Sequence, residues 1–344
     1  MELPVMTRTD NKCFMLFASC IPVKGFAKSI IADIQREQYL PVPNLLADIL
    51  IENRGVSIGE IKNRYQHQYD EGLDSYFQEL ARSEWGFFTE DPDCFPPLSL
   101  EWDHPSAITH AILDIDQSRH YELTPVIKEL DEQGCKALQI RGFGEIDTLS
   151  MEEWLEAAED TGIFSLEMIL PLSAFRSVSE AEKMILRYCR IVSLTLYGAE
   201  NEGFANTTHP ASEDIIYLTR QAVTPYSKEL SGPEFFTTNI HAFTEAQHFN
   251  LGLNRKITVD IRGNIRHFPG HSRVFGHISS DTLTAVVGTK EFQAVWQTPV
   301  DKIENCKECE FRYMCADNSE VVQKGEKIYR LTTCTYNPRT GEWQ

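Results

Sequence analysis

The sequence predicts an α/β protein built in three parts, and three observations support this. The first part, residues 1–95, starts with strand-like apolar runs and continues with helical patterns. The second, residues 100–235, alternates strands and helices, which is typical of a parallel sheet covered by helices. The third, residues 236–344, gathers four of the nine cysteines of this 344-residue chain. A chain of this length is expected to divide into two or three domains.

The first part predicts a small winged-helix-like module. Two apolar runs, at residues 14–19 and 29–34, flank a turn signal and are expected to pair as a β-hairpin. Three helices are predicted next, at residues 43–51, from residue 57 onward, and at residues 70–83. A closing strand is predicted at residues 85–89. Prolines behind the closing strand predict a linker to the second part.

Local sequence patterns support two of these predicted helices. Ser57 and Glu60 have the spacing of a capping box, with serine at the cap and glutamate three residues later. In the longer helix, Leu73, Phe77 and Leu80 fall on one face, which is therefore expected to be buried.

The second part predicts repeating strand–helix units. The expected strands lie at residues 107–115, 137–141, 164–170 and 191–197, and the expected helices at 123–133, 150–160 and 177–189. Gly134 is expected to end the first helix, and Ser150 with Glu153 to cap the second. This pattern fits a partial TIM-type (β/α) barrel or an open doubly wound sheet, and periodicity leaves both open.

Ligand-binding residues of an α/β sheet lie at the carboxyl ends of its strands. The residues in that position after the first two strands are Asp114, Asp116, His120, Arg141, Gly142, Gly144 and Glu145. The two glycines would let a backbone approach a ligand, with Glu145 taking an amine or hydroxyl. The alternative is a tight turn with an exposed carboxylate, and His120 is expected to be a surface loop residue.

The third part carries a predicted metal site. Cys306, Cys309 and Cys315 are separated by two and five residues, and Cys334 follows eighteen residues later. Thiolates at such spacing enclose a soft ion or an iron–sulfur cluster. A closed four-thiolate site has no vacant position for substrate, so we expect a structural or electron-storing role. We expect one [4Fe–4S] cluster, with a structural zinc ion as the alternative.

A hairpin and a helical segment precede these cysteines. The hairpin is expected at residues 254–268 with its turn at Gly263 and Asn264, and the helical segment at residues 280–296.

Composition excludes some partners. The formal net charge of −19 argues against nucleic acid, because a phosphate backbone would be repelled. The N-terminus lacks a signal-peptide layout and no apolar run reaches the length of a membrane span. We expect a cytoplasmic location, and the sequence leaves open whether the protein forms a homodimer.

The cysteine pattern resembles a known family. Cys306, Cys309, Met314 and Cys315 with the distal Cys334, behind a hairpin at residues 259–265, resemble the SPASM domain of peptide-modifying radical S-adenosylmethionine enzymes. The whole layout is similar to the SPASM-domain peptide maturases of grasp-with-SPASM systems. The matching stretches are residues 17–25, 102–109, 253–256, 309–315 and 336–338.

The resemblance implies a role in maturing a ribosomally made peptide of the graspetide type. Its implied partners are a precursor peptide, bound through its leader region, and an ATP-grasp ligase. The N-terminal module resembles winged-helix elements that recognise a leader by strand addition at the hairpin edge. The alternative for that module is a role in packing or dimerisation.

The resemblance also shows what this chain lacks. The radical enzymes need three cysteines in a C-x3-C-x2-C loop after their first barrel strand, and residues 116–122 contain none. Radical chemistry is therefore not expected, and the 142–145 loop would be a relic of the motif that contacts the cosubstrate's amino group. The first auxiliary cluster's ligands would fall near Gly252, Phe268 and Ser319 (or Asn318), none of which binds iron. The nearby His248, His267 and His271 are expected to be ordinary surface or hairpin residues.

Two functions compete. In the first, the chain is a non-catalytic adaptor that binds the precursor and assists the ligase. In the second, it is an enzyme that uses non-radical chemistry at the strand-end residues Asp114, Asp116, His120, Arg141 and Glu145. A tight arrangement of these side chains around a pocket would favour the enzyme. A metal-bearing interaction protein unrelated to peptides is a third reading, favoured if the hairpin edge is covered.

Overall fold

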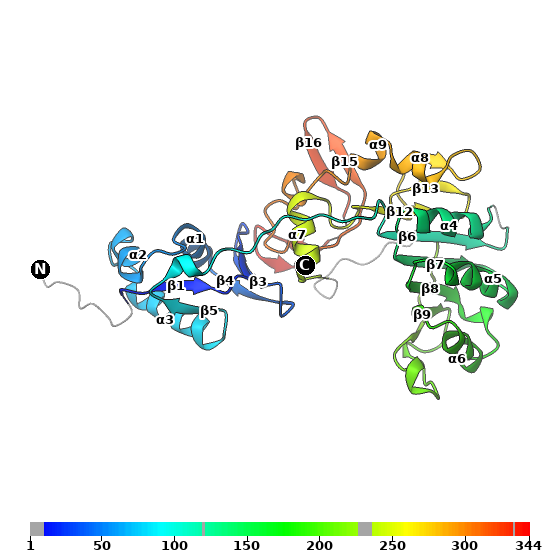
Figure 1. Cartoon of the computed structure of the whole chain (residues 1–344), viewed down its shortest axis with the longest axis horizontal. Helices are drawn as coiled ribbons and strands as arrows, with labels where there is room; N and C mark the ends of the chain where they lie inside the picture. Colours follow the sequence, from blue (N-terminus) through cyan, green and yellow to red (C-terminus); the bar gives the residue numbers. More distant parts are fainter. Residues whose placement is uncertain (1–9, 119–120, 226–235, 333) are drawn as a thin grey trace, which may run out of the picture.

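The computed structural model describes residues 10–118, 121–225, 236–332 and 334–344. The chain is a mixed α/β protein with one large sheet. In Figure 1 the N-terminal module lies at one end and the large sheet at the other, and the C-terminal hairpins lie between them. The first and last parts of the chain therefore meet in the middle of the molecule, and the fold is not a simple row of consecutive domains.

The large sheet has nine strands in the order β10-β11-β9-β8-β7-β6-β12-β13-β14. From β6 to β9 the order follows the sequence and every pair is parallel, as expected for consecutive strand–helix units. The strands are β6 (His110–Asp116), β7 (Ala137–Phe143), β8 (Ser165–Pro171), β9 (Ile191–Tyr197), β10 (Gly203–Phe204), β11 (Ile216–Thr219), β12 (Lys256–Val259), β13 (Asn264–Arg266) and β14 (Gly276–His277). The helices of these units are α4 (Leu123–Glu132), α5 (Thr148–Glu159) and α6 (Val178–Arg187).

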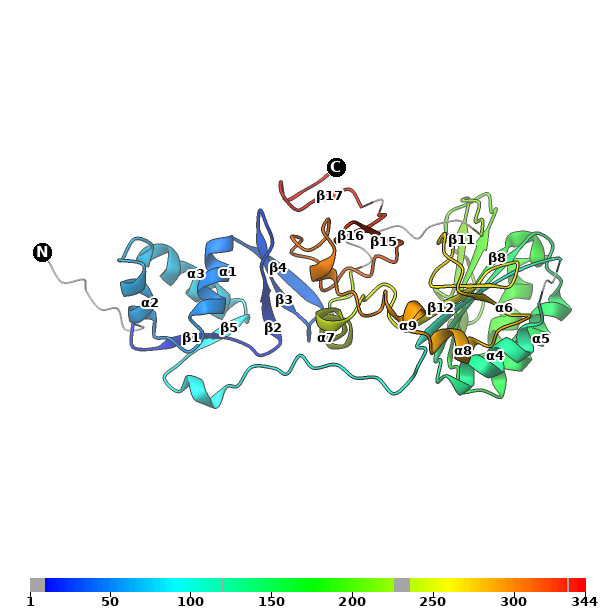
Figure 2. The same cartoon turned by 90° about the horizontal axis from the view of Figure 1, so that it is seen from above.

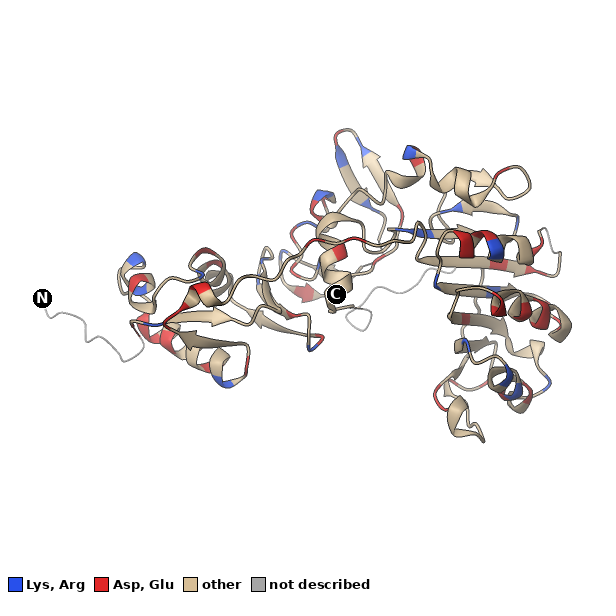
Figure 3. Cartoon of the chain, in the orientation of Figure 1, with Lys and Arg blue, Asp and Glu red and all other residues tan. Residues whose placement is uncertain are grey.

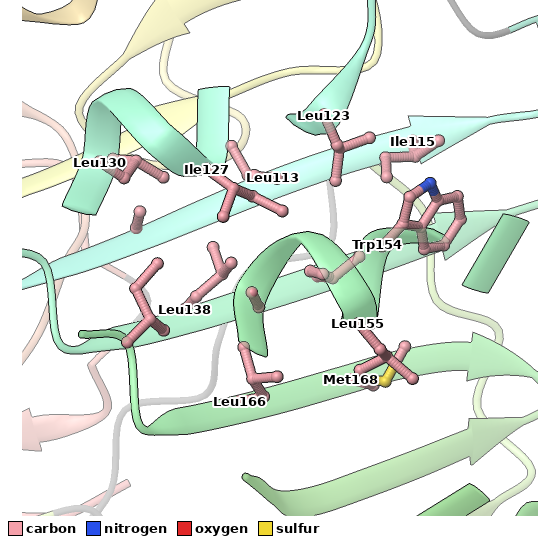
Figure 4. Close-up of a cluster of buried hydrophobic side chains, with 14 of the residues drawn as sticks. Leu113, Ile115, Leu123, Ile127, Leu130, Leu138, Trp154, Leu155, Leu166 and Met168 are labelled. Carbon is pink, nitrogen blue, oxygen red and sulfur yellow. The ribbon is translucent and has the colours of Figure 1, made fainter. Parts of the chain in front are cut away.

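Helices cover one face of this sheet. Leu138 of β7 and Met168 of β8 point toward Ile127 of α4 and Leu155 of α5 in a single buried cluster (Figure 4). On the other face, Gln139 donates a hydrogen bond to the exposed Glu167 at 3.0 Å. The strands thus alternate between an apolar helix-covered face and a more polar face.

The N-terminal module contains two small sheets and three helices. The strands are β1 (Cys13–Leu16) paired with β5 (Gly86–Thr89), and β2 (Cys20–Val23), β3 (Ser29–Asp33) and β4 (Gln38–Val42) in the order β2-β3-β4. The helices are α1 (Asn44–Glu52), α2 (Ile58–Arg64) and α3 (Asp70–Arg82). Ser57 caps α2 by accepting from the Glu60 N–H at 3.3 Å, and Leu73, Phe77 and Leu80 are buried, so both local predictions are confirmed.

The expected pairing of residues 14–19 with 29–34 is wrong. A turn in which the Cys20 N–H donates to the Phe17 carbonyl divides the apolar run into two strands. The first of these, β1, pairs with β5, far along the chain, and only the second, β2, forms the hairpin with β3. β4, which contains Pro41, was not predicted.

Two helix predictions in the rest of the chain also need correction. α5 is capped by Asp147, which accepts from the Ser150 N–H at 2.9 Å, so Ser150 lies inside the helix and does not cap it. The segment expected as one helix at 280–296 is two short ones, α8 (Leu283–Val287) and α9 (Lys290–Gln293), separated at Gly288.

The predicted hairpin around Gly263 forms from β12 and β13, with Gly263 at φ +84°. Its strand β12 also pairs in parallel with β6, so this segment extends the large sheet. The remaining elements are α7 (Ile240–His248), β15 (Val321–Lys324), β16 (Lys327–Arg330), β17 (Tyr336–Asn337) and β18 (Glu342–Trp343).

The tip of the N-terminal hairpin docks on the cysteine-rich segment. The Phe26 N–H donates to the Glu308 carbonyl at 2.9 Å, and the Ala27 N–H to the Pro338 carbonyl at 3.1 Å. Behind these bonds one apolar cluster joins strand residues such as Ile30 to Phe311 and Tyr336. The linker between β5 and β6 runs alongside this junction as an extended chain (Figure 2).

Acidic and basic residues both occur on helices α2, α3, α4 and α6, whereas α5 carries acidic residues without basic ones (Figure 3). Within the described ranges, none of the helices has the length and apolar character that crossing a membrane requires.

Candidate metal centre and strand-end loops

Tight turns shape the segments that carry the four cysteines. The Cys309 N–H donates to the Cys306 carbonyl at 2.9 Å, which is the turn expected of two cysteines with two residues between them. The Cys315 N–H donates to the Phe311 carbonyl at 3.1 Å. Cys334 follows β16, and its N–H donates to the Thr332 hydroxyl at 2.9 Å. The site is therefore assembled from one compact loop and one distant return of the chain.

The thiols influence one another electrostatically. Burial raises the pKa of Cys306 to about 12, and Cys315 and Cys334 raise it further. Burial likewise raises the pKa of Cys309, with Cys315 and Cys306 contributing. The pKa values of Cys315 and Cys334 are raised by burial too. These free thiols hold their protons at neutral pH, so a metal would have to displace them on binding.

A buried arginine lies beside the thiols. Arg330, at the end of β16, is 5% exposed and donates to the Asp317 carbonyl and, at 3.0 Å, to the Asn250 side chain. Its Nε is buried without a hydrogen-bond partner in the described structure. The Arg330 charge acts to lower the pKa values of Cys306 and Cys315. A donor with no partner next to thiols fits a site whose ligands carry negative charge.

The donor set fits a thiolate-bound metal or cluster. Among residues 10–118, 121–225, 236–332 and 334–344, no three or more His, Cys, Asp or Glu side chains are already arranged to hold a metal ion. Binding would therefore require the four side chains to draw together around the ligand. Their chemistry, four soft sulfur donors with a cationic neighbour, suits zinc or a [4Fe–4S] cluster equally.

The positions at which the resemblance would place the ligands of a first cluster include packed residues. A Cβ built on Gly252 would lie 2.0 Å from the Asp317 carbonyl oxygen, so a cysteine cannot replace this glycine without moving the backbone. Phe268 is buried. His271 bonds through Nε2 to the Asn318 carbonyl at 2.9 Å. At Gly252, therefore, the Asp317 backbone leaves no room for a cysteine side chain.

The three histidines near this region differ from one another. His248 lies at the surface, where its Nε2 bonds to the Leu100 carbonyl at 3.2 Å. His267 and His271 are buried, although all three were expected to be surface or hairpin residues. His267 Nε2 lies 2.7 Å from the Phe292 carbonyl, which can only accept, so the proton is on Nε2. Both buried rings line a cavity of about 210 Å³.

At the carboxyl ends of the strands, Asp114 and Arg141 form a buried bidentate ion pair. Arg141 Nε and Nη2 each donate to one Asp114 oxygen at 2.7 Å, and Nη2 also donates to the Pro225 carbonyl at 3.2 Å. Asp114 is fully buried, and burial raises the pKa of its carboxyl against the opposing effect of Arg141. The two side chains satisfy each other and leave little capacity to bind a ligand.

The other predicted strand-end residues do not join this pair. Asp116 accepts from the Ser118 N–H at 2.8 Å, and Glu145 is exposed. A Cβ on Gly142 would lie 2.7 Å from a Leu170 methyl group, so this glycine makes room for the core, and Gly144 has φ +76° in a turn. His120 lies outside the described residues.

Sequence reasoning missed two neighbours of the ion pair. The Tyr121 hydroxyl donates to the Asp114 carbonyl at 2.8 Å. Asp260, at the end of β12, binds Arg266 at 2.9 Å and lines a polar cavity of about 270 Å³. The sequence did predict the hairpin that contains Asp260. No local pattern, however, indicated that the first strand of this hairpin, β12, would pair with β6.

No family model and no curated protein matches the chain. Among solved structures, the chain is similar to SuiB of Streptococcus suis in three crystal structures: bound to S-adenosylmethionine (8% identity, TM-score 0.33), without a stated ligand (9%, 0.34) and bound to the precursor peptide SuiA (10%, 0.33). The alignments cover 88% of this chain and 95%, 94% and 95% of SuiB. TM-scores at this level do not establish a common fold, so the interpretation rests on the residues described above.

Proposed function

We propose that this chain is a peptide-maturation adaptor. It binds a ribosomally made precursor through the leader region and assists a partner ATP-grasp ligase, without radical S-adenosylmethionine chemistry. In this proposal the N-terminal module is a winged-helix-like recognition element, the large sheet is a degenerate partial barrel, and the C-terminal segment is a SPASM-like domain in the cytoplasm of a bacterium. Whether the adaptor acts as a homodimer is left to experiment.

The observation that supports the proposal is the position of the cysteine-rich segment, whose Glu308 carbonyl accepts a hydrogen bond from the Phe26 N–H of the docked hairpin. Cys306, Cys309, Cys315 and Cys334 would hold one [4Fe–4S] cluster, with zinc as the alternative, and such a group would supply structure or electron storage. The chain has no cysteine in the loop after β6, where the radical enzymes bind their catalytic cluster. One thiolate site behind a recognition module supports an adaptor better than a radical enzyme.

The enzyme alternative receives no such support from the geometry. Asp114 and Arg141 are buried against each other, while Glu145 is exposed on a turn. A general acid or base must reach its substrate with a free proton site. We therefore keep the adaptor as the proposed function.

One anaerobic preparation tests the proposal. The measurements are iron, sulfide and zinc content, visible absorbance, and S-adenosylmethionine binding by calorimetry. We expect either about four irons and four sulfides per chain, as one cluster of this type requires, or one zinc ion, and no cosubstrate binding in either case. Tight cosubstrate binding would overturn the proposal and indicate an enzyme, and a chain free of iron and zinc would overturn the metal site.

A further inference from the structure

The cavity of about 210 Å³ that contains the two buried histidines is separate from both sites described above. It is lined by residues from the β13–β14 connection, α9 with the residues after it, and the β15–β16 hairpin. Leu253, Val295 and Ile328 give it an apolar wall, and ionisable side chains complete the lining. The lining contains none of the four cysteines and none of the strand-end residues. The proposed function therefore leaves this cavity without a role.

His267 offers the cavity one hydrogen-bond acceptor. Its Nε2–H donates to the Phe292 carbonyl at 2.7 Å, so Nδ1 has a lone pair and no proton. The rings of Phe275 and Phe292 hold its orientation, with centroids 4.4 and 4.3 Å from that of His267. Among the residues that the structure describes, none forms a hydrogen bond with Nδ1. His267 is 7% exposed, and of its two nitrogens only Nδ1 is left to meet a molecule in the cavity.

The uncharged state of this imidazole decides which group it can bind. Burial lowers the pKa of His267 to about 4, so the ring is neutral at neutral pH. A neutral imidazole accepts through its unprotonated nitrogen and cannot donate there. A buried acceptor without a partner is unfavourable and is rare in folded proteins. The group that meets Nδ1 in the cavity must therefore be a hydrogen-bond donor.

The carboxylates around the cavity differ in how their charge is balanced. Among the described residues, Glu291 forms an ion pair, with Arg273, and Glu320 forms none. Glu320 accepts from the Ser272 N–H at 3.0 Å and from the Ser272 hydroxyl at 2.6 Å, and neither donor is charged. Burial raises the pKa of Glu320, but these bonds and the influence of His271 outweigh that effect and lower it. Glu320 is thus ionised at neutral pH and favours a cation in the cavity.

We propose that this cavity binds a small organic ammonium ion, which donates an N–H to His267 Nδ1 and whose charge Glu320 balances. The apolar wall would cover the hydrocarbon part of the ion. The volume of about 210 Å³ is below the ~300–1,000 Å³ of sites for drug-sized ligands, so the ion is small. A free amine and a lysine side chain share this chemistry. The inference does not depend on the proposed function.

Matched five-carbon compounds test the charge of the ligand. The full chain, as purified, is titrated with pentylamine, 1-pentanol and pentanoate, and the His267 Nδ1 signal is followed by nitrogen-15 NMR. We expect pentylamine to shift this signal, 1-pentanol to bind at least about tenfold more weakly because it lacks the charge-assisted hydrogen bond, and pentanoate to leave it unchanged. Equal binding of amine and alcohol, or no shift with the amine, would overturn the proposal.

A fourth compound identifies the source of the ammonium group. Nα-acetyl-lysine amide presents the same charge on a side chain carried by a peptide backbone. Binding as tight as that of pentylamine would support the proposal with a lysine side chain as the ligand. Binding of pentylamine alone would support it with a free amine.

Two charge-matched variants locate the site. Glu320→Gln and Glu326→Gln remove the same charge from nearby parts of the chain, but only Glu320 lines the cavity. The new amide oxygen can still accept from Ser272, so Glu320→Gln is expected to fold. It should weaken pentylamine binding about tenfold, and Glu326→Gln should leave binding unchanged. His267→Phe, which keeps a planar ring without Nδ1, should abolish it. Equal affinities in the two glutamine variants would overturn the site.

Discussion

Two buried arginines contribute to this fold in different ways. Arg141 is satisfied by both oxygens of Asp114 and by a backbone carbonyl, so it completes an interior ion pair. Arg330 bonds through both terminal nitrogens, while its Nε is buried without a partner in the described structure, and its charge acts on Cys306 and Cys315. Only the second arginine has remaining capacity to interact with a bound group.

Arg330→Lys is therefore expected to weaken metal retention without unfolding the chain. Lysine keeps the charge near Asp317 but removes the Nε donor and the planar geometry. Loss of such a partner typically costs about 10–100-fold in metal affinity. The measurement is the rate of zinc or iron release to a chelator, with Arg273→Lys on the exposed surface as control. Identical release rates in both variants would contradict the prediction.

His267 gives the stability a predictable pH dependence. Burial lowers its pKa to about 4 from 6.5, with a smaller opposing effect from the Phe292 carbonyl. His271 and Arg273 act in the same direction as burial, and Glu320 opposes it. The unfolded chain therefore binds more protons than the folded chain between about pH 4 and pH 6.5, so stability falls as the pH is lowered through this window.

The contribution of His267 to the free energy of unfolding should fall by about 2 kcal/mol between pH 7 and pH 5. His267→Gln retains a donor for the Phe292 carbonyl but does not titrate, so the variant should lose less stability over this range than the parent. Urea unfolding at both pH values measures the difference. Parallel losses in parent and variant would show that other groups set the pH dependence.

At the scale of elements, helices α1 to α6 and the repeating strands β6 to β9 could be predicted, whereas strand partners far apart in the sequence could not. Leu73 and Phe77 mark their helix by a local period of 3.6 residues, and β7 to β9 lie within a few residues of the predicted spans. The pairing of β1 with β5 and of β12 with β6 joins distant segments. No local pattern encodes such a choice, because the same alternation fits several partners.

For the candidate site, the sequence likewise predicted what depends on local spacing and did not predict what depends on distant contacts. The spacing of Cys306, Cys309 and Cys315 predicts them as ligands, because a short turn can bring such side chains together, and this stays a prediction. The roles of Arg330 and of the Asp114–Arg141 pair depend on contacts across the sheet and between hairpins, which spacing does not reveal. The capping of α5 failed for a simpler reason, since Asp147 and Ser150 both have capping side chains and the sequence favours neither.

The identity of that cap can be tested directly. Asp147→Ala should cost about 1 kcal/mol of stability, because it removes the acceptor for the Ser150 N–H at the start of α5. Glu153→Ala, which would break the capping box first expected from the sequence, should change stability by less than about 0.5 kcal/mol. Chemical denaturation of both variants decides between the two caps, and a larger loss for Glu153→Ala would restore the original prediction.

At the scale of the whole molecule, the cysteine-rich segment and the N-terminal module share one junction. Glu308 and Pro338, which flank the cysteines, accept the two backbone hydrogen bonds from the hairpin tip. Arg312 also donates to the Lys24 carbonyl at 2.7 Å. Order in the cysteine loops is therefore expected to hold the N-terminal module in place.

Cys306→Ala should both lower the melting temperature and release this module. Ligation contributes folding free energy directly, so its loss should loosen the loops that bind the hairpin. Chymotrypsin should then cut faster in the linker at residues 95–105. Cys189→Ala, at an exposed position, is the control. Unchanged cleavage and melting with full metal content would refute the coupling.

The docking of the hairpin also has a consequence during protein synthesis. Lys28 binds the carbonyl of Gly341, which is 313 residues further along the chain. At ~5–20 residues per second, a ribosome needs on the order of 15–60 s to make that stretch. Throughout this interval the strand face carrying Ile30 and Ala32 lacks Phe311 and Tyr336, the residues that later cover it. The nascent chain is thus expected to be a chaperone client until residues 311–341 have been made and can cover this face.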